Sequence, residues 1–168
     1  MPISMSQASA TRFAQMLNNL SAILAKAQAH CEARKIDPLV LTSARLYPDM
    51  FAFARQIQVC CDTAKGAVAR LAGVEVPRHE DNEETFAELK ARIAKTIDFI
   101  QSVKPAQIDG SEEKDIVLKT PTRELNFKGA QYLLAFAWPN FYFHAATAYD
   151  ILRHNGVELG KLDFLGGR

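Results

Sequence analysis

Four long segments of this sequence repeat apolar residues at steps of three and four, the spacing that places one apolar stripe along a helix. The segments cover about residues 4–35, 48–73, 82–104 and 129–155. The stripes are Phe13, Leu17, Leu20, Leu24, Ala27 and Cys31; Ala54, Ile57, Cys61, Ala64, Val68 and Leu71; Phe86, Leu89, Ile93, Ile97, Ile100 and Val103; and Leu133, Ala137, Phe141, His144, Ala148 and Ile151. Long amphipathic helices joined by mostly short loops favour an antiparallel four-helix bundle.

Local signals predict where these helices begin. Ser4 and Gln7 have the spacing of a capping box ahead of the first helix. Pro48-Asp49 is expected to open the second helix, because proline suits the first turn and a carboxylate suits the positive end of the helix dipole. Asp81 or Asn82 is expected to cap the third helix.

The connection between the third and fourth helices has a different pattern. Residues 115–119 and 123–127 alternate apolar and polar side chains around Thr120-Pro121-Thr122, which predicts a small β-hairpin. Pro139 lies inside the fourth helix and predicts a kink near residues 135–140. The expected fold is therefore all-α with one small hairpin, in a single domain over residues 1–168.

Composition narrows the class of function. Twenty basic and nineteen acidic side chains give a net charge of +1, so there is no global electrostatic case for binding nucleic acid or an anionic membrane. No stretch approaches 18 uncharged apolar residues, which argues against a membrane span. The three cysteines, Cys31, Cys60 and Cys61, lack the CxxC spacing and fit small buried hydrophobes in a reducing cytoplasm.

His144 is the polar residue in the apolar stripe of the fourth segment. A buried neutral imidazole needs a hydrogen-bond partner, so His144 is either a core histidine satisfied by one neighbour or a residue that holds a ligand. Bundle cores do hold metals and cofactors through inward side chains. His154 is ten residues further, about 15 Å along a helix, and cannot share a metal with His144.

Three residues of the second segment could accompany His144. If the second and fourth helices run parallel, as an up-down-up-down order requires, Asp62 lies at about the level of His144 and could form a buried pair with shifted pKa values. The alternative for Asp62 is a solvated flank position, and the alternative for Asp49 is a partner of the helix dipole. Gln56 lies close to the helix seam, where it either lines a cavity or reaches the surface.

Two stretches together resemble a bacterial family of unknown function in the DinB/YfiT-like superfamily. The first is Leu46-Tyr-Pro-Asp-Met-Phe-Ala-Phe-Ala-Arg-Gln-Ile-Gln58, continued by Cys61-Asp-Thr-Ala-Lys-Gly66 and Arg70-Leu-Ala-Gly73. The second is Pro139-Asn-Phe-Tyr-Phe-His-Ala-Ala-Thr-Ala-Tyr-Asp-Ile-Leu-Arg-His-Asn-Gly156, followed by Leu159-Gly-Lys-Leu-Asp-Phe-Leu-Gly166. The resemblance extends over nearly the whole chain.

This resemblance implies a four-helix bundle that commonly pairs into a homodimer. In metal-binding relatives, one histidine from the second helix and two spaced four apart on the fourth hold a divalent ion. Some of these relatives act as thiol-dependent transferases or hydrolases. His144 resembles the first histidine of the helix-four pair, the place of the second is taken by Ala148, and the helix-two position falls near Asp49. Any zinc or nickel ion would therefore have His144 and at most one nearby carboxylate as ligands.

Two functions follow as expectations. The first is an atypical or degenerate metal-dependent enzyme of the transferase or hydrolase class. It would bind a small molecule near His144, with Asp49, Gln56, Asp62 and Tyr149 nearby. The second is a non-catalytic homodimeric module that binds a ligand or a partner without metal. The sequence assigns no catalytic residue in either case.

Overall fold

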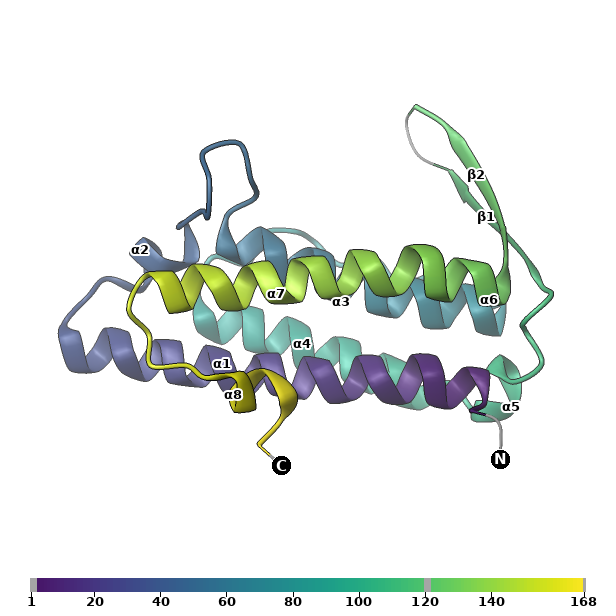
Figure 1. Cartoon of the computed structure of the whole chain (residues 1–168), viewed down its shortest axis with the longest axis horizontal. Helices are drawn as coiled ribbons and strands as arrows, with labels where there is room; N and C mark the ends of the chain where they lie inside the picture. The colour runs from purple at the N-terminus through teal and green to yellow at the C-terminus, as the bar shows by residue number, and fades with distance from the viewer. Residues whose placement is uncertain (1–2, 120–121, 168) are drawn as a thin grey trace.

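The computed structural model describes residues 3–119 and 122–167. Four long helices lie side by side along its longest axis (Figure 1): α1 Arg12–Arg34, α3 Phe53–Ala72, α4 Phe86–Ser102 and α7 Trp138–His154. Shorter helices are α2 Pro38–Thr42, α5 Pro105–Ile108 and α8 Lys161–Leu165, and a π-helical turn, η1 Gln7–Thr11, precedes α1. The prediction of a mostly helical chain is confirmed. Within the described ranges, no helix combines the length and apolar character needed to cross a membrane.

The start of the first helical segment is as predicted. The backbone N–H of Ser4 donates to Oε1 of Gln7 at 3.1 Å, and the N–H of Gln7 donates to Oγ of Ser4 at 3.3 Å, which is the reciprocal pattern of a capping box. At the other end, Lys35 adopts a left-handed conformation with φ of 55° and ends α1. Asp37 then caps α2 by accepting from the N–H of Leu39 at 2.9 Å.

Two predicted helix starts are wrong. Pro48 and Asp49 lie in a turn, and α3 begins only at Phe53. The cap of α4 is Thr85, whose Oγ1 accepts from the N–H of Glu88 while Glu88 accepts from the N–H of Thr85. Asp81 is not available as a cap, because its carboxylate binds the side chains of Arg55 on α3 and Arg92 on α4.

Cross-helix contacts fix the directions of the helices. Gln56 near the start of α3 touches His144, and Arg70 near its end touches Tyr132, so α3 and α7 run antiparallel. In the same way, Ser6 binds Asp109 and Gln28 binds Lys90, so α1 and α4 also run antiparallel. The distances of these last two contacts are 2.8 and 2.9 Å.

Helices α3 and α4, by contrast, run parallel. Phe53 packs on Phe86 near their starts, with ring centroids 5.9 Å apart, and Asp62 binds Arg92 about two turns further along each helix. The predicted up-down-up-down order is therefore wrong. The two helices can run parallel because residues 74–85, which connect them, contain no helix or strand. Twelve extended residues reach about 40 Å, enough to run back along a 20-residue helix of about 30 Å.

The predicted hairpin is confirmed. Strands β1 Asp115–Lys119 and β2 Glu124–Lys128 pair antiparallel, with Asp115 opposite Lys128 and Lys119 opposite Glu124. The expected turn at Thr120-Pro121-Thr122 includes residues 120 and 121, which lie outside the described residues. Figure 1 shows that the hairpin projects from the end of the molecule where α6 Gly129–Gln131 follows β2.

Pro139 does not break the last long helix. The chain passes without interruption from α6 Gly129–Gln131 through a π-helical turn, η2 Tyr132–Ala137, into α7, whose first turn contains Pro139. A proline lacks the N–H of the normal helical bond and crowds the carbonyl four residues back. The wider π turn ends at Ala137, two residues before the proline, and overlaps the region where a kink was predicted.

The core follows the predicted stripes. Every stripe position except Ala54 is buried. Phe13 of α1 meets Phe141 of α7 edge-on, with ring centroids 4.9 Å apart. His144 belongs to the same buried face of α7 as Phe141.

Candidate functional site

His144 faces the first turn of α3, and only 8% of its surface is exposed. Its Nδ1 lies 2.6 Å from Oε1 of Gln56. The side-chain nitrogen of Gln56 in turn donates to the backbone carbonyl of Phe51 at 3.0 Å. Phe51 precedes α3, so its carbonyl lies outside the helical hydrogen-bond ladder and can orient the amide.

This short relay sets the tautomer of the imidazole. Because the amide nitrogen of Gln56 points to a carbonyl, its Oε1 faces His144 and can only accept a hydrogen bond. Nδ1 of His144 must therefore carry the proton and donate it. In a neutral imidazole this leaves the lone pair on Nε2, which can accept a hydrogen bond or bind a metal.

The surroundings keep the imidazole neutral. Burial, and to a lesser extent the positive charge of Arg55, lower the pKa of His144 below its ordinary value. The ring of Phe51 stacks on the imidazole with centroids 6.2 Å apart and an angle of 18°, and Phe143 meets it edge-on at 5.2 Å. At neutral pH the site therefore offers an uncharged acceptor next to two aromatic rings.

These residues line a small open pocket of about 210 Å³. Its walls are Asp49, Met50, Phe51, Gln56, Phe143 and His144. Phe51 and Phe143 are 49% and 56% exposed, so the rings of both phenylalanines remain accessible. The pocket is thus mainly apolar, with one oriented acceptor and one exposed carboxylate.

The donor set of this pocket does not fit a zinc or nickel centre. Among the described residues, no group of three His, Cys, Asp or Glu side chains is placed to hold a metal ion. Ala148, four residues after His144, is buried and has no donor atom. Catalytic zinc sites use three protein ligands, whereas this pocket supplies one imidazole and the carboxylate of Asp49.

Two of the predicted site residues lie elsewhere. Oδ1 of Asp62 binds Lys65 and Arg92, each at 2.7 Å, and Tyr149 packs edge-on against Phe164 of α8 at 5.9 Å. The predicted pair of His144 with Asp62 does not form. Because α3 and α7 are antiparallel, the helical position that faces His144 is Gln56, and each step from there along α3 moves away from the histidine.

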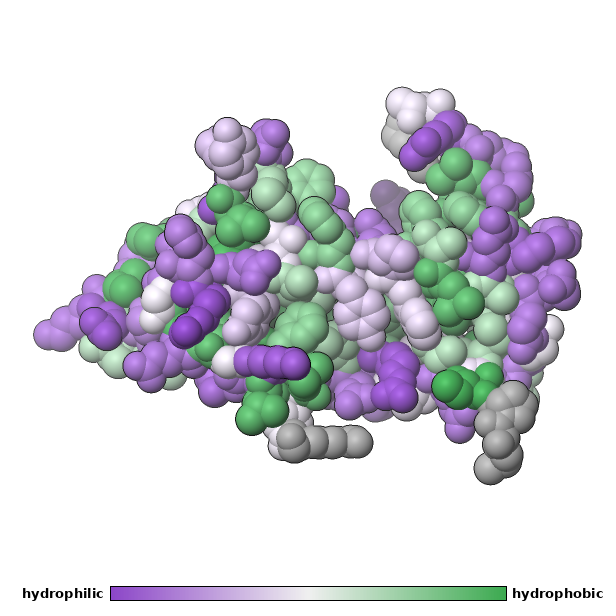
Figure 2. Space-filling model, in the orientation of Figure 1, coloured by the Kyte–Doolittle hydropathy of each residue, from purple (hydrophilic) through white to green (hydrophobic). Residues whose placement is uncertain are grey.

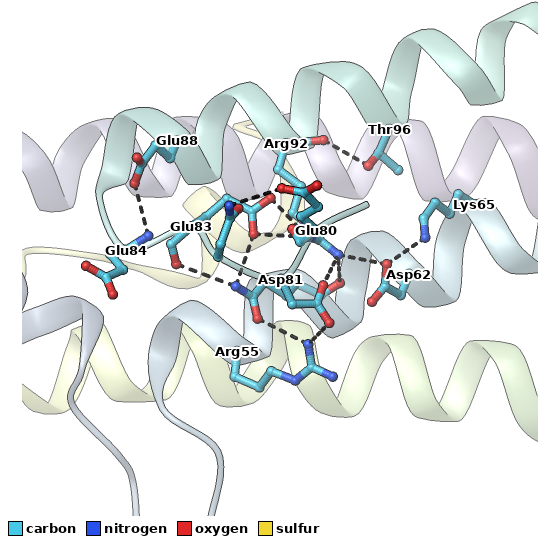
Figure 3. A network of polar contacts seen from close by, with 12 residues as sticks. Arg55, Asp62, Lys65, Glu80, Asp81, Glu83, Glu84, Glu88, Arg92 and Thr96 are labelled. Carbon is cyan, nitrogen blue, oxygen red and sulfur yellow. Dashed lines mark hydrogen bonds and ion pairs between the residues drawn. The ribbon is translucent and has the colours of Figure 1, made fainter. Parts of the chain in front are cut away.

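A second polar cluster surrounds Arg92 of α4, whose side chain is 1% exposed (Figure 3). Its Nη2 binds Asp62 at 2.7 Å and Asp81 at 2.9 Å. Its Nη1 binds Glu83 at 3.0 Å and donates to the carbonyl of Glu80 at 3.0 Å. The buried guanidinium thus connects residues 74–85 and α3 to α4. The negative charges of the carboxylates offset the free-energy cost of burying it.

Further cations complete this cluster and link it to the pocket. Lys65 binds Asp62, and Arg55 binds Asp81. The guanidinium of Arg55 also lies over the ring of Phe51, 5.8 Å from its centroid. Burial opposes the ionisation of Asp81, but hydrogen bonds and charges of Arg55 and Arg92 outweigh it and lower the pKa of this carboxyl. The cluster is therefore an ionised network whose first role is structural.

Sequence reasoning missed Arg92, although a signal was present. Leu89, Arg92 and Thr96 continue the three-four spacing on the flank of the α4 stripe, and all three are buried. An arginine at such a position requires several acceptors. Acidic residues precede it closely in the sequence, and two of those in the connection, Asp81 and Glu83, are the ones that bind it.

Comparison with known proteins agrees with this architecture. A domain family described as a domain of unknown function, DUF1993, matches residues 5–165. The chain belongs to this family. The DUF1993 chain is also similar to a solved structure described as a DinB family member protein from Shewanella denitrificans, with 42% identity and a TM-score of 0.88. That match covers 97% of this chain and 92% of the other. No curated protein matches the chain.

Proposed function

We propose that this DUF1993 protein is a non-catalytic module that binds a small planar molecule at His144, on a four-helix bundle built from two antiparallel helix pairs. The observation that carries this proposal is the relay from the Phe51 carbonyl through Gln56 to His144. The relay holds the lone pair of Nε2 in one fixed orientation inside a pocket with accessible aromatic walls.

The lining defines the class of ligand. Phe51 and Phe143 favour a flat apolar body, because aromatic rings stack or meet edge-on at little entropic cost. Nε2 of His144 requires one O–H or N–H donor on that body. A phenol-like or azole-like ring satisfies both demands. Arg55 and Asp49 lie near the pocket with opposite charges, so neither strong anions nor strong cations are favoured.

The partner of the imidazole argues for binding over acid–base catalysis. In catalytic triads a carboxylate accepts from Nδ1 and stabilises the imidazolium that forms when Nε2 takes a proton. Here a neutral amide occupies that place, and burial and Arg55 both oppose protonation. His144 is therefore better suited to accept a hydrogen bond than to remove a proton.

A matched pair of probes tests this proposal. Phenol and anisole share a ring, but only phenol has a donor. In NMR titrations of the whole chain, phenol should shift the amide signals of residues 49–56 and bind roughly two- to tenfold more tightly than anisole, since one net hydrogen bond contributes about 0.5–1.5 kcal/mol. His144→Phe should abolish this preference, whereas His154→Phe, at the exposed C-terminal end of α7, should keep it. Equal binding of the two probes would overturn the proposal.

The alternative, a metal-dependent enzyme, is tested by a separate measurement. Elemental analysis of protein purified without tag or chelator would detect a resident metal. Near-stoichiometric zinc or nickel, lost in His144→Ala, would replace our proposal with the enzyme hypothesis of the transferase or hydrolase class. Phenol selectivity in metal-free protein would support the binding module.

The proposal includes a homodimer in a reducing cytoplasm. Exposed apolar side chains cluster in sequence on α2 and on the connection to α3, namely Leu39, Val40, Leu46 and Tyr47. Apolar residues also gather at the base of this connection in Figure 2. Contiguous apolar patches commonly mark protein interaction surfaces. Light scattering should give a dimeric mass that EDTA does not change, and a monomer would contradict this part.

A further inference from the structure

The connection over residues 74–85, here called the strap, is held almost entirely by side chains of α3 and α4. Arg92 of α4 binds Asp81, Glu83 and the carbonyl of Glu80 in the strap. Beside these contacts an open cavity of about 440 Å³ lies between the strap and α4. The strap is therefore attached by ion pairs between its own carboxylates and cations of the neighbouring helices. A new positive charge on the strap would be repelled by those cations and would weaken the attachment.

His79 of the strap is such a group. Both of its ring nitrogens are buried, and neither has a hydrogen-bond partner. Burial first, and then the positive charges of Lys65 on α3 and of Arg92 and Lys95 on α4, lower the pKa of His79, and Asp62 opposes them only in part. Ring nitrogens that are buried without partners favour the neutral form of the imidazole over the charged form.

The nearby carboxylates are already engaged. Asp62 binds Lys65 and Arg92, and Glu83 binds Arg92. Glu88, which also lines the cavity, accepts from the N–H groups of Glu84 and Thr85 at the start of α4.

Within the strap, Glu80 accepts from the side chain of Asn82 at 3.3 Å, and Asp81 binds Arg55 and Arg92. Arg78, the neighbour of His79, adds a further positive charge on the cavity wall. A protonated His79 would thus enter a cluster in which the acidic groups have partners and the remaining charges repel it. The closed strap therefore disfavours an imidazolium at His79.

We propose that the strap is a pH-operated latch: protonation of His79 releases residues 77–84 from α3 and α4 and uncovers the buried side chain of Arg92. Opening hydrates both ring nitrogens and separates the imidazolium from three cations. The linkage has a definite sign, because neutral His79 stabilises the closed strap above the ordinary histidine pKa of about 6.5. That stabilisation is lost as the pH falls from this value toward the lowered pKa of the closed state.

Hydrogen exchange of the whole chain tests the latch. Protection factors of amides in residues 78–84 should fall, by at most about tenfold per pH unit, between the histidine pKa values of the open and closed states, while α1 stays protected. His79→Phe should keep the strap protected down to pH 5.5, because phenylalanine fills the same space and His79 makes no hydrogen bond that would be lost. Equal loss of protection in this variant and in the natural chain would overturn the proposal.

Control variants distinguish the effect of His79 on the strap from the effects of the other histidines. His144 also titrates below its ordinary pKa and lies near Arg55, which binds Asp81. In His144→Gln and in His154→Gln the strap should open with the natural pH dependence. NMR titration of His79 in the natural chain gives a readout that needs no variant: its midpoint should lie below 6.5 and coincide with strap opening. A midpoint at or above 6.5 would refute the latch.

Discussion

Arg92→Met gives the sharpest test of how the strap is held. The substitution keeps a long side chain in a position that is 1% exposed but removes the guanidinium. Asp62 keeps Lys65 and Asp81 keeps Arg55, so Glu83 is the carboxylate left without its cation, retaining only the amide of Gln58 at 3.1 Å.

The expected magnitude follows from this geometry. Removing one partner of a buried ion pair costs about 3–5 kcal/mol, and partial exposure of the three carboxylates, between 14% and 39%, reduces this to roughly 2–4 kcal/mol. In a domain of this size each kcal/mol lowers the melting temperature by about 2–4 °C. Urea unfolding followed by circular dichroism measures the change in the free energy of unfolding.

Arg55→Met is the matched control. Arg55 and Asp81 are each 39% exposed, so this ion pair should contribute less than about 1 kcal/mol. The double variant Arg92→Met with Glu83→Gln should recover part of the lost stability, since it removes the unpaired carboxylate. A loss below about 1 kcal/mol in Arg92→Met would show that desolvation of the arginine cancels its ion pairs, and the reasoning would fail.

Three further predictions concern other parts of the molecule. A Cβ at Gly129 would lie 1.9 Å from the backbone oxygen of Ser111, whereas one at Gly160 would meet nothing within 4 Å. Gly129→Ala should therefore lower the melting temperature and cost roughly 1–3 kcal/mol, with Gly160→Ala as a near-neutral control. Burial raises the pKa of the Cys61 thiol to about 11, so thiol reagents should modify it at pH 8 only after unfolding, and rapid labelling of the native chain would contradict its burial. The lowered pKa of Asp81 should make stability fall as the pH drops below about 4, and Asp81→Asn should flatten this acid limb in urea titrations.

The candidate site was only partly predictable from the sequence. His144 stood out because it is a polar residue in an apolar stripe, and the structure places Gln56 and Asp49 in the same pocket. Asp62 was wrongly assigned to this site because its position relative to His144 depends on the relative direction of two helices. Tyr149 faces α8 instead, a contact that the helical period of α7 alone does not reveal.

Local patterns in the sequence determined which residues form helices and which helix faces are buried. They also determined that a hairpin follows the third long helix. These features depend on neighbours three and four residues apart, or two in a strand, so the sequence specifies them directly. The start of α4 is also a local signal, because Thr85 and Glu88 have the spacing of a capping box. The direction of that helix, by contrast, was decided by tertiary structure. Asp81 and Glu83 bind Arg92, which follows them in the chain, and α3 also contributes Asp62. The buried charge of Arg92 is satisfied only by the strap and α3 together, and such non-local pairing cannot be read from helical spacing.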